Sequence, residues 1–530
     1  MKKYLSALTV ALATLTAANA GNPYLPLWEY IPDGEPYLFE DPDNPGHMRV
    51  YVYGSHDSMV SGYCGRELVV WSASPEDLNN WRYDGIIFES KKDAEGKWLD
   101  RNGFGDVLYA PDVAVRTEDG RKVYYLYPNN QASGRKNMVA KSYRPDGPFE
   151  VCNWDPQDPR KTVGPLDFDP AVFVDDDGRV YGYWGFEKSY AAELDPETMA
   201  TVKEGTEIVV DLVSSKGQEG VFRFFEASSI RKIEDKYVFV YSRCTEVGEF
   251  GLPTTNYTLA YAWSDSPLGP FKYGGTIIDG RGRGLDKDGK PAPTATVGGN
   301  THGGILEING QWYVFYHRQC GTDEYSRQAM VAPIEVKVTK DNVYISEGEY
   351  TSEGFEINGL DPLKKYSAGI ACQYTGPEPG KQSWPNFTFS GSYVKPLRPE
   401  AIGYCNLYDP KINHNPVVNN TDGSVVGYKY FNFDSTNGIK GKLNLALEVI
   451  PEGIDGTIDI MIDSPWKERG GVKIGSISLK KDMPQILTEV KAEVSAARGL
   501  KGKHAVYFVI SSDTKAKSLC EIHTLGFVVL

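Results

Sequence analysis

Acidic side chains stand directly before several strand-like segments of this sequence, at a regular spacing. Asp112, Asp169, Glu226 and His302 each lie 11 residues before a position in a strand-like segment rich in aromatic residues, at 112 to 123, 169 to 180, 226 to 237 and 302 to 313. Asp33 holds the same place at a longer spacing, 33 to 50, because residues 40–46 lengthen the turn. Carboxyl groups gathered in this way can divide acid–base work: a protonated one donates a proton, and an ionised one activates water or attacks directly. Cleavage of a glycosidic bond needs both functions, and a third anion nearby raises the pKa of the acid.

These positions become equivalent if the chain repeats one structural unit. Five segments rich in tyrosine and valine recur, most of them after a tight-turn pair such as Asp119-Gly120 or Asn309-Gly310. They occupy 50–53, 123–127, 180–184, 237–241 and 312–316, and their starts lie 73, 57, 57 and 75 residues apart. This spacing leaves room for about four short strands per repeat, the size of a β-propeller blade. We therefore predict an all-β protein whose five-bladed β-propeller brings the acidic residues into a ring at one end of its channel.

Acidic residues before strands can also be simple turn formers, and for one position this explanation is as good as the ring. Four carboxylates in register favour the ring, because crowding like charges into a channel costs stability unless function retains it.

The composition limits the partners. The 530 residues include 56 Lys+Arg and 71 Asp+Glu, which gives a formal net charge of −15 and argues against a nucleic-acid partner. The 34 tyrosines, 21 phenylalanines and 10 tryptophans, together with 55 glycines and 33 prolines, favour strands joined by turns. An acidic surface does not repel a neutral sugar. The chain length predicts two domains.

The first residues read as an export signal. Lys2 and Lys3 precede an apolar run over 5–18, and Ala18-Asn19-Ala20 is a small-residue cleavage site. We predict a signal peptide over 1–20, a mature chain from Gly21, and a periplasmic or extracellular protein. No later stretch approaches the roughly 20 apolar residues of a membrane span.

Seven cysteines are scattered without a CxxC pair or metal-ligand spacing. Neither a zinc site nor a disulfide scaffold is expected. Buried thiols are the favoured interpretation, and a bridge between Cys372 and Cys405 is the alternative.

From Asn22 to about Ile345 the chain carries an ordered series of motifs that resembles glycoside hydrolase family 43. The motifs are Pro32-Asp33-Gly34-Glu35-Pro36, Tyr53-Gly54-Ser55-His56-Asp57, Tyr109-Ala110-Pro111-Asp112, Phe168-Asp169-Pro170, Glu226-Ala227-Ser228, Thr301-His302-Gly303 and Arg327-Gln328-Ala329. This family consists of five-bladed propeller enzymes that act on plant cell-wall sugars with inversion of the anomeric centre. The resemblance implies that Asp33 is the general base, Glu226 the general acid, and Asp169 the residue that orients the acid and tunes its pKa.

One departure leaves the base open between two residues. The family often has Asp-Pro at this place, whereas here Asp33 is followed by Gly34 and a second acid, Glu35. Counting back from Phe39 favours Asp33, although a bulge would change the count.

Six further residues are expected to bind substrate: His56, Tyr109, Asp112, Trp184, His302 and Arg327. Arg327 suits sugar hydroxyls and Asp33, with a surface salt bridge as the alternative. His302 either holds water or an ion on the axis or is a satisfied channel histidine. Alternatively, His56 stabilises a turn, and Trp184 packs in the hydrophobic core of a blade. No cofactor is required and no metal ligand is assigned; structural calcium or water on the axis stays open, without any calcium-loop spacing.

After about Gly348 the repeat stops, so we predict the propeller over 21–348, a linker over 349–363 and a β-sandwich over 364–530. The part from Gly427 resembles family 6 carbohydrate-binding modules in 427–431, 458–464 and 502–508. Trp384, Tyr404 and Tyr428 either stack on glycan or belong to the core, and the sandwich either binds glycan or braces the propeller.

Together these features predict a secreted, inverting hydrolase that removes terminal sugars from plant polysaccharides or oligosaccharides, of the α-L-arabinofuranosidase or β-xylosidase type. A β-galactofuranosidase or galactanase of the same fold is one alternative, and a sugar-binding propeller without catalysis is another. A propeller scaffold for protein partners fits least well, because it would not require an ordered acid ring.

Overall fold

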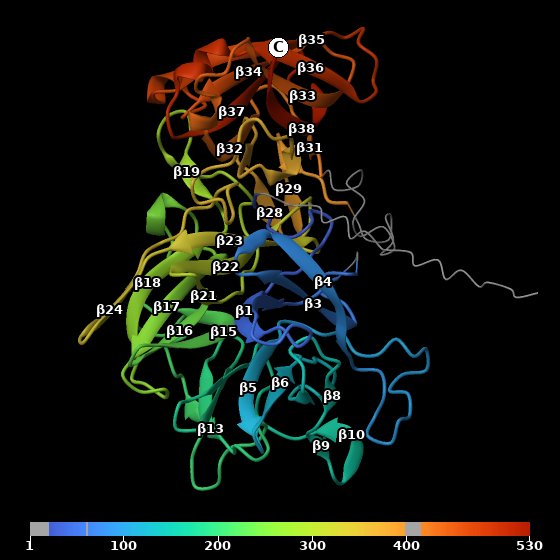
Figure 1. Ribbon diagram of the computed structural model, residues 1–530, viewed down its shortest axis with the longest axis vertical. Helices are drawn as coiled ribbons and strands as arrows, with labels where there is room; N and C mark the ends of the chain where they lie inside the picture. The colour runs from blue at the N-terminus through green and yellow to red at the C-terminus, as the bar shows by residue number, and fades with distance from the viewer. Residues whose placement is uncertain (1–20, 60–61, 398–414) are drawn as a thin grey trace, which may run out of the picture.

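The computed structural model describes residues 21–59, 62–397 and 415–530. The predicted export signal, Tyr404 and Cys405 lie outside these residues, and Cys372 is a buried free thiol. Strands dominate, accompanied by the short 3₁₀ helices η1 (Glu249–Gly251), η2 (Ala368–Ile370), η4 (Phe433–Thr436), η5 (Lys467–Arg469) and η6 (Ser495–Gly499) (Figure 1). Within the described ranges, no helix is long and apolar enough to cross a membrane.

The described part of residues 35–334 contains five antiparallel sheets whose strands are neighbours in chain order. The first holds β1 (Glu35–Glu40), β2 (Met48–Tyr53), β3 (Glu67–Ser74) and β4 (Asp77–Glu89). The second holds β5 (Asp112–Glu118), β6 (Arg121–Tyr127), β7 (Ala140–Ser142) and β8 (Glu150–Val151). The third holds β11 (Ala171–Val174), β12 (Val180–Trp184), β13 (Tyr190–Leu194) and β14 (Val209–Val210). The fourth holds β15 (Phe224–Ile233), β16 (Lys236–Arg243), β17 (Thr258–Ser264) and β18 (Lys272–Asp279), and the fifth β21 (Ile305–Ile308), β22 (Gln311–Gln319) and β23 (Arg327–Ile334).

Smaller hairpins project from these sheets. They are β9 (Trp154–Asp155) with β10 (Asp158–Thr162), β19 (Arg283–Leu285) with β20 (Pro291–Pro293), and β24 (Val336–Thr339) with β25 (Asn342–Ile345).

The turn pairs seen in the sequence close two of the inner hairpins. Asp119 and Gly120 join β5 to β6 with φ of 47° and 78°, and Asn309 and Gly310 join β21 to β22 with φ of 51° and 82°. Positive φ at both central residues suits the right-handed twist of the paired strands, and Asp, Asn and Gly tolerate it best.

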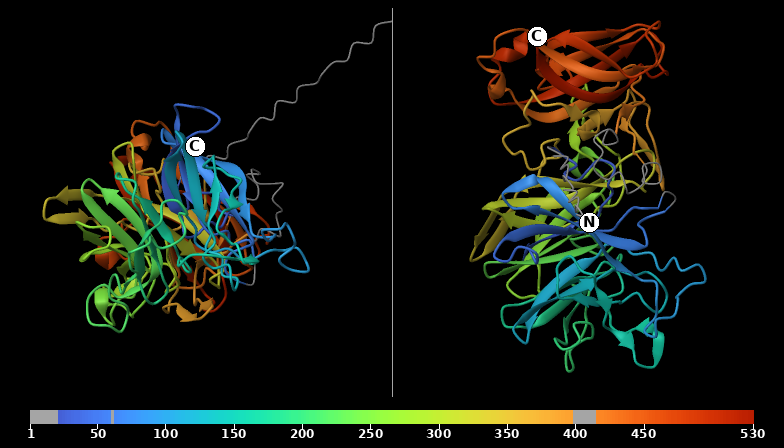
Figure 2. Two further views of the ribbon diagram at one scale, coloured as in Figure 1. Left: turned by 90° about the horizontal axis from the view of Figure 1, so that it is seen from below. Right: turned by 45° about the vertical axis from the view of Figure 1, so that its right-hand side comes forward.

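The second strand of each sheet is buried on both faces, and its alternate side chains enter two different cores. In β2, Val52 packs in a core that also contains Phe315 of β22, whereas Tyr53 packs in a core with Tyr124 of β6. The same division recurs in β6, β12, β16 and β22. In the described chain, five such cores separate neighbouring sheets, the last of them between the fifth sheet and the first. The sheets therefore form a ring, which confirms the five-bladed propeller (Figure 1). The C-terminal sheets lie beyond one side of this ring (Figure 2, right).

The C-terminal part forms two further sheets and a hairpin. One sheet follows the order β30 (Tyr393–Val394), β31 (Val417–Val418), β38 (Cys520–Val529), β33 (Leu443–Pro451) and β36 (Thr488–Glu493), with β26 (Tyr366–Ser367) paired to β38. The other follows β27 (Gln373–Thr375), β32 (Val425–Asn432), β37 (Lys503–Ser512), β34 (Gly456–Ile462) and β35 (Val472–Leu479). The hairpin pairs β28 (Lys381–Ser383) with β29 (Asn386–Thr388). Strands stop at Ile345 and resume at Tyr366, while the proposed domain limits stay predictions.

One hydrophobic core continues from the propeller into the sandwich. It contains Val314 of the fifth blade together with Tyr374, Val426 and Tyr428 of the C-terminal sheets. Tyr428 is fully buried there and donates a hydrogen bond to the carbonyl of Ala368 at 3.1 Å, so its ring offers no face to a glycan. The bracing role anticipated as an alternative for the sandwich therefore has a physical basis in this shared core.

Arg318 at the end of β22 joins the two parts inside this core. Its fully buried guanidinium donates to the Gln328 side chain at 3.0 Å, to the carbonyl of Ala371 at 2.7 Å, and to the carbonyl of Gly369. Loss of such donors would leave buried carbonyls without partners.

Replacing this arginine tests how strongly the two parts depend on one another. Arg318→Met keeps the bulk and removes the donors, so it should lower the free energy of unfolding by about 3 kcal/mol, measured by urea denaturation. Arg179→Met is the matched control, because the Arg179 side chain is 49% exposed on a blade surface. An exposed ion pair contributes less than about 1 kcal/mol. Equal stabilities of the two variants would contradict a coupling through Arg318.

Candidate active site

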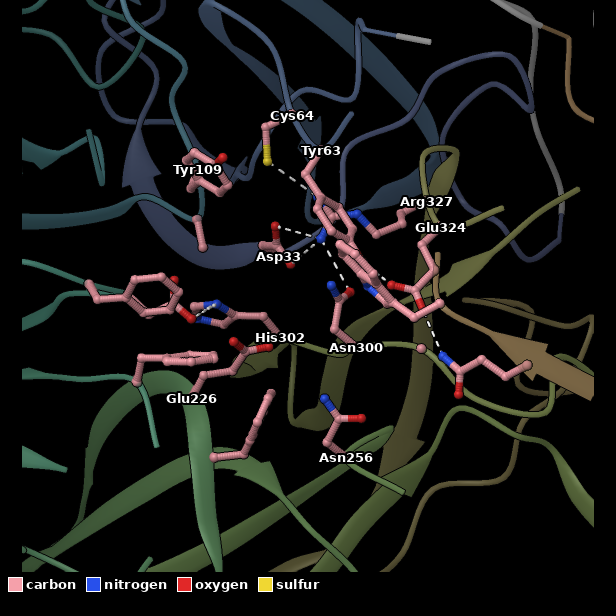
Figure 3. A pocket seen from close by; sticks show the side chains of 18 residues that line it. Asp33, Tyr63, Cys64, Tyr109, Glu226, Asn256, Asn300, His302, Glu324 and Arg327 are labelled. Atoms are coloured by element: carbon pink, nitrogen blue, oxygen red, sulfur yellow. Dashed lines mark hydrogen bonds and ion pairs between the residues drawn. The ribbon is translucent and has the colours of Figure 1, made fainter. Parts of the chain in front are cut away.

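A cavity of about 450 Å³ opens where the innermost strands of the propeller begin. Asp33, Asp169, Glu226 and His302 lie at or just before β1, β11, β15 and β21, and all four line the cavity (Figure 3). The register of the repeats therefore brings together four of the five residues in the predicted ring. Tyr109 and Arg327, both predicted to bind substrate, line it as well.

The backbone at these residues adopts conformations that side chains seldom accept. Asp33 has φ of 61°, Asp169 has φ of 43°, and Ala227, next to Glu226, has φ of 70°. A non-glycine residue in the left-handed region costs of order 1 kcal/mol or more and persists only where the surroundings enforce it. The blades thus hold the carboxyls in directions that relaxed strands would not give.

Asp33 is surrounded by groups that favour its ionised form. Arg327 Nη1 lies 3.2 Å from each carboxylate oxygen, and the Ser55 hydroxyl donates to Oδ2 at 2.5 Å. Burial alone would raise the pKa of Asp33, but the Arg327 charge and these contacts bring it below its ordinary value. Asp33 is therefore the ionised carboxylate of the cavity.

His317, which the sequence did not single out, fixes the backbone at Asp33. The Asp33 amide donates to His317 Nδ1 at 3.2 Å, so this nitrogen carries no proton. His317 Nε2 lies 2.8 Å from the carbonyl of Asn300 and is the protonated nitrogen that donates to it. Burial lowers the pKa of His317 to about 3, which keeps the ring neutral.

Arg327 is itself held by a second carboxylate. Asp57 accepts from Arg327 Nε at 2.9 Å and from Nη2 at 2.8 Å, a two-point contact that fixes the plane of the guanidinium. Tyr63 covers that plane, with its ring centroid 5.0 Å from the guanidinium carbon. One arginine thus links Asp57, which does not line the cavity, to Asp33, which does.

Asp169 and Glu226 share the cavity as a coupled pair of carboxyls. Burial, followed by the negative charge of Asp33, raises the pKa of Asp169 to about 8. Burial, followed by the charges of Asp169 and Asp33, raises the pKa of Glu226 well above its ordinary value. The Asn129 amide donates to Asp169 Oδ1 at 2.7 Å and the Ala227 amide to Oδ2 at 3.0 Å, which stabilises Asp169 as an anion. Of this pair, Glu226 therefore keeps its proton to the higher pH, and Asp169 ionises first as the pH rises.

His302 lies between Asp169 and the residue that competed with Asp33 as base. Its Nδ1 is 3.6 Å from Asp169 Oδ2, and its Nε2 is 3.8 Å from Glu35 Oε1. Burial lowers the pKa of His302 to about 4, so the ring is neutral. Glu35 does not line the cavity, because it pairs with Arg231 at 2.7 Å. Among the described residues, no group of three or more His, Cys, Asp and Glu is arranged to hold a metal ion.

His56 is a correction to the predicted pocket. It is 2% exposed and lies 3.2 Å from both Glu29 and Glu67. Burial would lower the pKa of His56, but these carboxylates raise it to about 10. The residue is a buried cation of the first blade and does not line the cavity.

Asp112 and Trp184 are two further corrections. Asp112 sits at the predicted register but accepts from the Tyr37 hydroxyl and from the Val172 amide, the latter at 2.7 Å, so it joins inner strands outside the cavity. Trp184 is 4% exposed and stacks on Tyr190 within a blade core. Its alternative role in the core is the observed one.

Comparison with known proteins gives this geometry a context. The model of the family described as "Glycosyl hydrolases family 43" matches residues 41–341, more than half of the chain. A xylosidase/arabinosidase of Thermoclostridium stercorarium is 31% identical over 519 residues, which cover 94% of this chain and 98% of that protein. The chain belongs to glycosyl hydrolase family 43. As a member of family 43 it is a glycoside hydrolase, and this confirms the predicted resemblance of its propeller.

Other family 43 proteins are similar over comparable lengths. An arabinoxylan arabinofuranohydrolase of Paenibacillus polymyxa is 25% identical over 511 residues, which cover 92% of this chain and 70% of that protein. The crystal structure of a family 43 arabinoxylan arabinofuranohydrolase from Bacillus subtilis in complex with cellotetraose aligns with a TM-score of 0.45 and 22% identity, covering 97% of this chain and 98% of that one.

Part of the family 43 cavity was not anticipated. Its further lining residues are Tyr63, Cys64, Ala110, Phe168, Phe186, Phe225, Asn256, Gly299, Asn300, Glu324, Gln382 and Trp384. Ala110 and Phe168 belong to recognised motifs and Asn300 adjoins one, so motif membership was a usable signal for these three. Gln382 and Trp384 come from the C-terminal part, and no local pattern indicated that they would reach the propeller.

The charge of Asp169 should control the pH range of activity. If Glu226 acts as the acid and Asp33 as the base, activity should fall as pH rises through the raised pKa of Glu226, and as pH falls through the lowered pKa of Asp33. Asp169→Asn removes a charge that raises the pKa of Glu226, so the alkaline limb of the kcat/KM profile should move to lower pH. At the optimum, kcat/KM should fall about 10- to 100-fold.

The control is Asp176→Asn, since the Asp176 side chain is 89% exposed in the same blade. Its pH profile should match the wild type. An alkaline limb that stays in place in Asp169→Asn would contradict the assigned coupling.

Proposed function

We infer that this enzyme is an inverting, exo-acting glycosidase that releases terminal α-L-arabinofuranosyl or β-D-xylopyranosyl units from plant cell-wall polysaccharides or oligosaccharides. The observation that carries the proposal is the contrast between two carboxyls in one cavity: Arg327 lies 3.2 Å from both oxygens of Asp33, whereas no ion pair to Glu226 is formed among the described residues. Asp33 is ionised by Arg327, and Glu226 is protonated by burial and neighbouring anions. A base that activates water and an acid that protonates the leaving oxygen are the two groups hydrolysis requires.

The cavity and the relatives support the choice of substrate. A volume of about 450 Å³ suits one or a few sugar units. The names xylosidase/arabinosidase and arabinoxylan arabinofuranohydrolase belong to relatives that cover more than nine tenths of this chain. Pentose side chains and ends of plant xylans are therefore the first substrates to test.

Two finer points belong to the same proposal. The pattern at 1–20 supports export, and detection of a mature N-terminus at Gly21 by mass spectrometry would test it. Glycan binding by the C-terminal sandwich, through its likeness to family 6 modules, stays a prediction.

A panel of nitrophenyl glycosides tests the activity and the base together. Wild-type enzyme should hydrolyse the α-L-arabinofuranoside, the β-D-xylopyranoside or both, and Asp33→Asn should lower kcat/KM by at least about 100-fold, since it removes the base. Asp43→Asn, whose side chain is 62% exposed, should keep full activity. Exclusive activity on the β-D-galactofuranoside or β-D-galactopyranoside would overturn the substrate, and undiminished activity of Asp33→Asn would overturn the base.

The anomeric form of the first product tests inversion. If Asp33 activates water while Glu226 protonates the leaving oxygen, the released sugar starts with the opposite configuration to the substrate. Proton NMR of the fresh reaction mixture, recorded before mutarotation, should show this. An initial product with retained configuration would assign Asp33 as a nucleophile instead.

A further inference from the structure

We propose that the hairpin β28–β29 of the C-terminal part supplies the binding subsite for the leaving group, with Trp384 as its stacking surface. The proposal rests on the exo-hydrolytic function inferred above. Gln382 and Trp384 both line the cavity, although they follow the propeller in the chain. Trp384 is 70% exposed, in contrast to the buried carboxyls below it. The substrate would therefore be held by two separate parts of the chain.

The hairpin is fixed to the fifth blade through Glu324. Gln382 Nε2 donates to Glu324 Oε1 at 2.7 Å, and the Tyr63 hydroxyl donates to the other oxygen of the same carboxylate. The Glu324 amide donates to the carbonyl of Pro385 at 3.0 Å, which holds the residue directly after Trp384. Glu324 is 2% exposed, so this junction is buried. Trp384 thus projects from a fixed turn rather than from a free loop.

The close-up view shows the arrangement of this wall. Glu324 and Tyr63 lie on the same side of the cavity as Arg327, and Glu226 and His302 lie across from them (Figure 3). A second contact fits the hairpin to the rim: a Cβ atom at Gly298 would come within 2.3 Å of Gln382 Oε1. The glycine leaves the space into which Gln382 fits.

The exposure of Trp384 assigns it to the leaving group. The cleaved sugar must reach Asp33 and Glu226 at the buried end of the cavity, so the rest of the substrate extends toward the mouth. An exposed indole at the mouth meets the next sugar, and its flat apolar face suits the C–H face of a pyranose ring. No ring–ring contact involves Trp384 among the described side chains, whereas Phe168 and Phe225 both pack on Phe186. The indole face is therefore available to substrate.

The test compares substrates that share a glycosyl group and differ in the leaving group. Xylotriose is paired with β-D-xylopyranosyl fluoride, and α-L-arabinofuranosyl-xylotriose with α-L-arabinofuranosyl fluoride, because fluoride fills no sugar subsite. Trp384→Ala should lower kcat/KM about 10-fold on the oligosaccharides and less than about 2-fold on the fluorides, and Trp384→Phe should restore most of the loss. Trp98→Ala is the control, since Trp98 is 55% exposed and lies outside the cavity lining.

Calorimetric binding of xylobiose, the leaving group of xylotriose, separates failure of this proposal from failure of the inferred function. The titrations use the Asp33→Asn background, so that xylobiose is bound without being hydrolysed. Xylobiose should bind Asp33→Asn equally with and without Trp98→Ala, and about 10-fold more weakly when Trp384→Ala is added. Equal binding with Trp384→Ala added, no binding to Asp33→Asn, or equal kinetic losses on oligosaccharides and fluorides would overturn the subsite. Absence of hydrolysis with xylobiose binding retained and sensitive to Trp384 would overturn only the inferred reaction.

Discussion

A single guanidinium group determines how the carboxyls of this cavity divide their protons. Asp33 and Asp169 are buried and Glu226 is half-buried, and withdrawal from water alone would favour the neutral form of each. Arg327 contacts only Asp33 among the three, so one carboxyl ionises, and its negative charge then raises the pKa of the other two. Because Asp57 fixes Arg327 from behind, the chemistry of the cavity depends on a contact outside it.

The sequence predicted the features that follow from local patterns. Tyrosine–valine alternation and the Asp-Gly and Asn-Gly turns indicated the blades, and equal spacing selected Asp169, Glu226 and His302 as neighbours. The spacing of these residues predicted which blade each belongs to. It did not predict whether a side chain reaches the cavity or which groups it bonds. Asp112 shares the register and still lies outside the cavity, because Tyr37 and Val172 bind it between strands. For His56 and Trp184, motif position did not distinguish the cavity from the blade core.

Contacts between distant segments were beyond the reach of sequence analysis. Trp384 was predicted either to stack on glycan or to belong to the core of the C-terminal part, but nothing near it in the chain encodes its approach to the fifth blade. Arg318 illustrates the same point: its partners at 369 and 371 follow from the docking of two sheet systems. The sandwich and the propeller share one core, so a substitution in either part can affect the other.

The two-sided burial of the middle strands has a consequence for how the ring tolerates change. In β2 the valines enter one core and the tyrosines another, so a one-residue slip would exchange small side chains for large ones in two neighbouring cores at once. The register of β2 is therefore fixed. Because β1 pairs with β2 residue by residue, the register of β1 is fixed as well. Length variation can be absorbed in the loops between strands but not within them. The position of Asp33 therefore depends on the difference in size between the valine and tyrosine side chains of β2, which do not contact the substrate.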